Sequence, residues 1–91
     1  KKVEVVLTAN RIINNPTNIE DGATYVIVIV QGNIGGYDIT WGDNFDFGTH
    51  GSLGLTNTVD KADILIFEAN SYGELCLTNI RKGFNWTSIG A

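Results

Sequence analysis

The feature that most restricts the fold is an uninterrupted run of six apolar, β-preferring residues, Y-V-I-V-I-V at 25–30, within the segment 24–31. Alternate side chains of a strand point to opposite faces, so a run without a polar break buries both of them. We therefore predict a central strand covered on two sides by a second sheet, a loop layer or a neighbouring subunit. The run is far shorter than the roughly 20 apolar residues of a membrane-spanning helix, which argues against membrane insertion.

The N-terminal part predicts two further strands. Residues 3–8 are β-branched and roughly alternate in polarity, and residues 11–13 form a shorter apolar piece. Pro16 and the asparagines around it then favour a turn, because proline has no backbone donor and asparagine adopts turn conformations readily.

A β-hairpin is predicted between the segments 24–31 and 37–42, because the glycine-rich stretch 32–36 suits a tight reversal. The second segment alternates cleanly, and its odd-numbered apolar positions extend into the following residues. The side chains expected on one face are Tyr37, Ile39, Trp41, Phe45 and Phe47. A loop is expected over 48–52, with Leu53 and Leu55 returning the chain to the core.

A final hairpin is predicted from residues 62–68 and 72–80, joined by a tight turn at 69–71. No helical period persists for three turns. We expect an all-β fold, an antiparallel β-sandwich or a jelly-roll-like barrel. The module is expected to span residues 1–83, with 84–91 as a C-terminal tail or linker.

The length of 91 residues allows one domain, whose small size leaves a thin margin of stability and makes oligomerisation a serious expectation. Charged residues are 18% of the chain, below the roughly 25% of an average soluble domain, so the surface is rich in neutral polar groups. This composition favours an extracellular or particle-surface location. The absence of methionine and the initial Lys1 suggest a piece of a longer polypeptide, and no signal peptide is evident.

The charge pattern argues against nucleic acid as a partner, because the net charge is −4 and the basic residues are few. The single cysteine, Cys76, cannot form an internal disulfide and lies between two leucines. It is interpreted as a small buried apolar residue rather than a reactive thiol.

No catalytic set and no cofactor or metal site is predicted. The acid pairs Asp43 with Asp46 and Asp60 with Asp63 lie beside turns, where aspartate caps the backbone. The first pair faintly resembles a calcium loop but lacks its glycine and distal glutamate. One histidine, His50, is too few for a zinc site within one chain, and its neighbour Ser52 is weak evidence for a nucleophile.

Exposed aromatic side chains are the remaining candidates for ligand binding, because aromatic rings stack on the apolar faces of sugars. Trp41 and Tyr37 are expected in the core or in a subunit contact. Packing in the core or in a subunit contact is also the favoured expectation for Trp86 and Tyr72. Trp86, Tyr72 and the loop that contains His50 remain the ligand-binding candidates.

The middle of the chain resembles a small β module of bacteriophage tail-fibre and other virion proteins. The resemblance lies in N-I-E-D-G-A-T-Y at 18–25, V-I-V-Q at 28–31, G-G-Y-D-I-T-W-G at 35–42 and D-I-L-I-F at 63–67, and it covers about residues 15–80. The chain has Gln31-Gly32 where that family often has Gln-Asp, and its turn at 70–73 also differs.

The resemblance implies a non-enzymatic structural or adhesion module of a homotrimeric phage fibre or spike at the virion surface. Such a module would act in trimer assembly, in attachment to other virion proteins or in host-receptor binding. A carbohydrate-binding module, with a host surface glycan as ligand, is the alternative.

Overall fold

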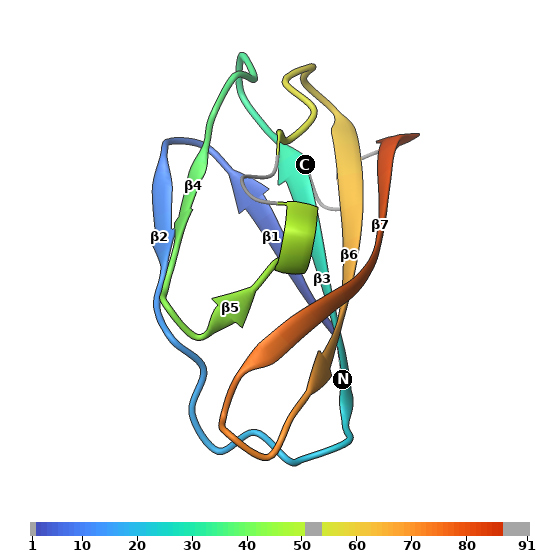
Figure 1. Ribbon diagram of the computed structural model, residues 1–91. Helices are drawn as coiled ribbons and strands as arrows, with labels where there is room; N and C mark the ends of the chain where they lie inside the picture. Colours follow the sequence, from blue (N-terminus) through green and yellow to red (C-terminus); the bar gives the residue numbers. More distant parts are fainter. Residues whose placement is uncertain (1, 51–53, 87–91) are drawn as a thin grey trace.

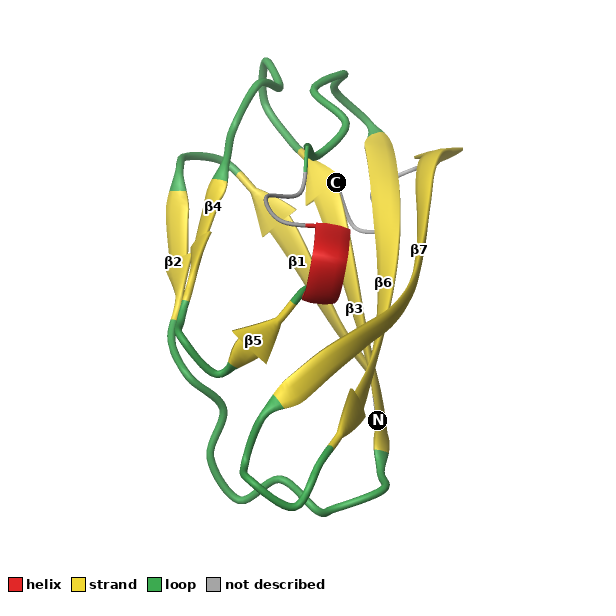
Figure 2. Ribbon diagram, viewed as in Figure 1, coloured by secondary structure: helices red, strands yellow, loops and turns green. Residues whose placement is uncertain are grey.

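The computed structural model describes residues 2–50 and 54–86, which form seven strands and one short 3-10 helix. The elements are β1 (Lys2–Leu7), β2 (Arg11–Ile13), β3 (Thr24–Gln31), β4 (Ile39–Trp41), β5 (Phe45–Asp46), the 3-10 helix η1 (Gly48–His50), β6 (Lys61–Ala69) and β7 (Leu75–Asn85). Figure 2 shows that strands dominate, so the all-β prediction is confirmed. No helix in the described ranges has the length and apolar character needed to cross a membrane.

The strands form a curled five-stranded sheet and a separate two-stranded ribbon (Figure 1). The order in the sheet is β1-β3-β6-β7-β5, and the ribbon consists of β2 and β4. The strand pairs β1–β3, β2–β4 and β5–β7 are parallel, whereas β3–β6 and β6–β7 are antiparallel. The arrangement is therefore mixed, and the expectation of antiparallel pairing throughout is wrong for three of the five pairs.

Strand β3 lies inside the sheet and is buried on both faces, as its sequence predicts. Ile27 and Ile29 join the main core on the concave face, and Val28 and Val30 form a second cluster with Ala62 on the opposite face. Each of these valines is only 1% exposed. The unbroken apolar run is thus explained by burial in two separate clusters.

The predicted hairpin between residues 24–31 and 37–42 does not form. Both edges of β3 are already occupied by β1 and β6, and β4 pairs with β2 instead. The buried side chain of Gln31 closes the intervening loop: its Nε2 donates to the carbonyl of Tyr37 at 2.7 Å, and its Oε1 accepts from the Tyr37 amide at 3.1 Å. Two hydrogen bonds from the Gln31 side chain therefore stand in place of the backbone hydrogen bonds that a hairpin would have formed here.

The hairpin of β6 and β7 is confirmed, with residues 70–74 as its turn. Strand β7 continues to Asn85, so the predicted boundary after residue 83 falls inside a strand. A bulge interrupts the pairing between Ala62 and Ile64, and Gly83 there has a φ of +77°, which favours glycine. Residues 87–91 of the predicted tail lie outside the described residues.

Phe67 is the centre of the main core and is fully buried. Its ring centroid lies 6.1 Å from that of Trp41, 5.6 Å from Phe45 and 6.2 Å from Phe47. The odd-numbered positions therefore share one face as predicted, and they pack the ribbon and β5 against the sheet. Leu55 also joins this core, whereas Leu53 lies outside the described residues.

Candidate functional site

The two aromatic ligand-binding candidates lie at opposite ends of β7. Tyr72 is in the turn before the strand, and Trp86 follows its last residue. All eleven residues of β7 lie between them, and a strand of that length spans up to roughly 35 Å at about 3.3 Å per residue. The structure does not bring them into one site. His50 ends η1, but its side chain lies outside the described part of the chain, as does Ser52.

Trp86 is partly buried against the second cluster of the sheet. Its indole Nε1 donates to Oε1 of Glu4 at 2.9 Å, and the Lys2 ammonium lies 5.9 Å from the ring centroid. Its backbone amide donates to the carbonyl of Asp60 at 3.0 Å. Trp86 therefore anchors the end of β7 to β1: the sequence favoured a packing role for this residue but did not indicate β1 as the partner.

Tyr72 has a different environment, because its side chain is 85% exposed at the tip of the β6–β7 turn. Asn70 fixes this turn: its Oδ1 accepts from the amides of Tyr72 at 2.9 Å and Glu74 at 3.0 Å. An aromatic ring on a well-ordered turn can stack on a flat apolar surface at little conformational cost.

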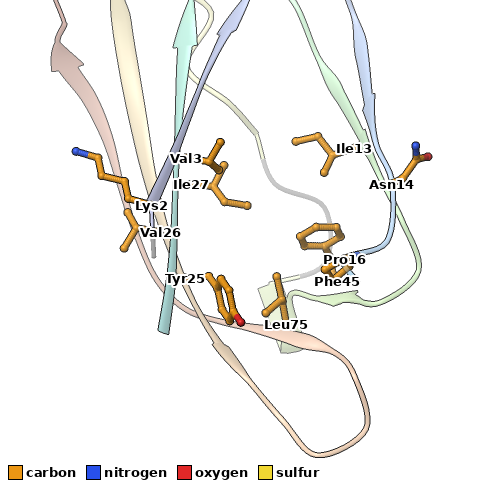
Figure 3. A pocket seen from close by; sticks show the side chains of 10 residues that line it. All are labelled: Lys2, Val3, Ile13, Asn14, Pro16, Tyr25, Val26, Ile27, Phe45 and Leu75. Carbon is orange, nitrogen blue, oxygen red and sulfur yellow. The ribbon is translucent and has the colours of Figure 1, made fainter. Parts of the chain in front are cut away.

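An apolar hollow of about 260 Å³ opens between β1 and the segment that follows β2 (Figure 3). Val3 and Ile27 line the side of the main sheet, and Ile13 and Pro16 line the opposite side. Phe45 lies beside Pro16, and Tyr25 and Leu75 are the lowest of the labelled side chains in the view. Since its lining is largely hydrocarbon, the hollow suits an apolar group rather than a sugar with many hydroxyls.

Two of the four aspartates singled out by sequence, Asp46 and Asp63, hold the backbone through their carboxylates. Asp46 Oδ1 accepts from the amide of Gly48 at 2.8 Å, which is the turn-capping role expected. Asp63 differs from expectation: it is 1% exposed on the core face of β6. Its carboxylate accepts from the Thr56 amide and hydroxyl, both at 2.7 Å, and from the Gly83 amide at 3.0 Å.

Metal and nucleophile chemistry find no support among the described residues. Within residues 2–50 and 54–86, no group of three or more histidine, cysteine, aspartate or glutamate side chains is placed to hold a metal ion. Cys76 is partly buried, and burial together with Asp46 and Glu74 raises the pKa of its thiol. A thiol with a raised pKa stays protonated at neutral pH and is a poor nucleophile.

Sequence reasoning missed the hollow, the structural roles of Gln31 and Asp63, and the contact of Trp86 with β1. A polar residue within or directly after an apolar strand run was an available signal, since both Gln31 and Asp63 sit in such positions. Buried polar groups require partners, so these two positions indicated long-range hydrogen bonds.

In comparisons with known proteins, no protein-family model matches the sequence, no curated protein matches it, and no solved structure matches the fold.

Proposed function

We propose that this chain is a non-enzymatic structural or adhesion module of a phage fibre or spike at the virion surface, acting in trimer assembly, in attachment to other virion proteins or in binding to a host receptor. The observation that carries the proposal is the use of its polar side chains. Gln31, Asp63 and Asn70 each form at least one side-chain hydrogen bond to the backbone of a loop. These contacts hold loops in place and so support a structural role, and the resemblance over about residues 15–80 supplies the particle context.

The fold behind this proposal is inferred to be sandwich-like. The ribbon of β2 and β4 covers the concave face of the main sheet, and Ile13, Ile39 and Trp41 pack against its core. A sandwich-like module whose described outer strand β1 has no partner on one side suits a protein that works by binding neighbours rather than by chemistry.

Immunogold labelling of purified particles with an antibody against this module tests the proposal. Label on fibres or spikes supports it, and particles that carry no label overturn the virion assignment. Analytical ultracentrifugation tests the homotrimer separately. A monomer at tens of micromolar, with a melting temperature that does not change on dilution, contradicts the trimer.

Carbohydrate binding is the second candidate function, and the exposed ring of Tyr72 on its ordered turn favours it. A glycan array with the intact chain, repeated with Tyr72→Ala, tests this candidate. A sugar that binds the parent and not the variant supports it. Trp86→Phe is the matched comparison, because Trp86 has a packing role that a conservative change largely keeps.

A further inference from the structure

The outer edge of β1 is the starting point, because β1 is the last strand on its side of the main sheet. Leu7 directs its carbonyl toward β3, where it accepts from the Gly32 amide at 2.8 Å. The backbone N–H and C=O groups of successive residues in a strand point alternately to its two sides. The backbone groups of Val3 and Val5 therefore also point toward β3. The N–H and C=O groups of Lys2, Glu4 and Val6 consequently point outward, and no described strand pairs with them.

This edge lacks the bulges and prolines that protect many edge strands, and its two charges, Lys2 and Glu4, have opposite signs. Strand β7 has exposed backbone beside β5 as well, but it carries two bulges and the adjacent cations Arg81 and Lys82. Strand β1 is regular over its length, and its Val3 and Val6 side chains are 52% and 41% exposed. Val3 also lines the apolar hollow, so the exposed apolar surface continues from the edge onto the concave side.

The order of the charges on β1 indicates which strand can pair with its outer edge. In an antiparallel pairing of β1 with β1 of a second copy, residues whose backbone groups point outward must lie opposite each other. Pairings centred on Lys2 or on Glu4 put like charges face to face, which is destabilising. Pairings centred on Val5 or Val6 place both charges opposite uncharged residues. Of these centres within β1, the one at Val3 places Lys2 of each copy opposite Glu4 of the other and so sets opposite charges face to face.

We propose that β1 is a docking edge for a second copy of this chain, which pairs with it antiparallel about a two-fold axis at Val3. Lys2 and Glu4 of the two copies exchange backbone hydrogen bonds, and their side chains form two ion pairs across the axis. Glu4 uses Oε1 for Trp86, so its Oε2 is the oxygen that meets the lysine. The two Val3 side chains meet beside the hollow, and the two sheets become continuous.

The contact does not depend on the function proposed above. In a trimeric fibre it joins copies that belong to neighbouring trimers, and in the isolated chain it makes a dimer. The overlap is short compared with the roughly 1,200–2,000 Å² of stable interfaces, so we expect the pairing to depend on concentration.

Disulfide trapping tests the register. In this pairing the two Val3 Cα atoms lie about 4.5 Å apart, within the range that a disulfide bridges. Val3→Cys in a Cys76→Ser background is therefore expected to give a two-chain band on a non-reducing gel. Val6→Cys in the same background is the matched control, because the two Val6 positions lie roughly 20 Å apart. No band from the Val3→Cys variant, or equal bands from both variants, overturns the proposal.

Charge exchange tests the occupant. In the Val3→Cys, Cys76→Ser background, Lys2→Glu alone or Glu4→Lys alone places like charges across the axis. Each is expected to weaken pairing about tenfold, as like-charge pairs replace opposite pairs. A mixture of the two variants restores both ion pairs, so the mixed disulfide, identified by its mass, is expected to predominate. Unchanged pairing of the single variants, or a mixture without preference for the mixed species, refutes the β1-to-β1 contact. Because the mixture contains the same chains, a folding defect cannot produce the recovery.

Discussion

Replacement of Asp63 with alanine is expected to destabilise this domain strongly. The carboxylate is 1% exposed and accepts three hydrogen bonds, two from the backbone amides of Thr56 and Gly83 and one from the Thr56 hydroxyl. Truncation leaves both amides without their partner, at about 1–3 kcal/mol each. We expect a loss of about 2–5 kcal/mol from a domain whose total stability is on the order of 5–14 kcal/mol.

Urea unfolding followed by tryptophan fluorescence measures this loss. With a slope of about 1.5 kcal/mol per molar, the midpoint is expected to fall by roughly 1–3 M. Asp63→Asn keeps one oxygen but turns an amide group toward a donor, so an intermediate loss is expected. The exposed Asp38→Ala is the control and is expected to change stability by less than about 0.5 kcal/mol. A midpoint for Asp63→Ala equal to that of the control refutes the structural role of this carboxylate.

Three further predictions concern the core, a close backbone approach and the thiol. Phe67→Ala is expected to cost about 3–5 kcal/mol and to abolish the near-ultraviolet circular dichroism of the aromatic cluster, and retention of that signal contradicts the packing. Gly42→Ala is expected to lower the free energy of unfolding by about 1–3 kcal/mol, measured by thermal melts, because a Cβ there would lie 2.7 Å from the backbone nitrogen of Asn15. Gly54→Ala meets no such contact and serves as the control. Cys76 is expected to react with iodoacetamide more slowly in the native chain than in urea at neutral pH, because burial and nearby carboxylates raise its pKa, and equal rates argue against this environment.

The proposals for function and for self-association address different parts of the molecule. The functional proposal draws on the use of polar side chains for loop structure and on the resemblance to virion modules. The docking proposal draws on the free edge of β1 and the order of its charges. Each can fail without the other, since particle labelling does not report on β1 pairing and disulfide trapping does not report on the particle.

Local pattern was sufficient to predict much of the secondary structure. The β1, β2, β3, β6 and β7 segments all carry β-branched or alternating residues and are strands in the structure. Alternation also predicted correctly that Tyr37, Ile39 and Trp41 point inward, because side-chain direction in a strand follows from the backbone alone.

Which strands pair with each other was harder to predict from the sequence. The glycine-rich segment 32–36 has the composition of a tight turn, but its flanking strands do not pair, because β1 and β6 compete successfully for both edges of β3. Likewise, the Trp86 ring is exposed or buried according to whether β1 lies beside it, and residue 86 is far from β1 in the sequence. Such contacts between distant segments leave no periodic signal.

The amino-acid sequence by itself determined an all-β domain with a doubly buried central strand and an inward-facing aromatic series, since each of these follows from residue type and short-range spacing. The tertiary structure alone decided which strands are neighbours, which pairs run parallel, where the apolar hollow opens and that no described strand pairs with the outer side of β1. These features arise from competition among distant segments for the same hydrogen bonds and the same core, and that competition is resolved only when the whole chain has folded.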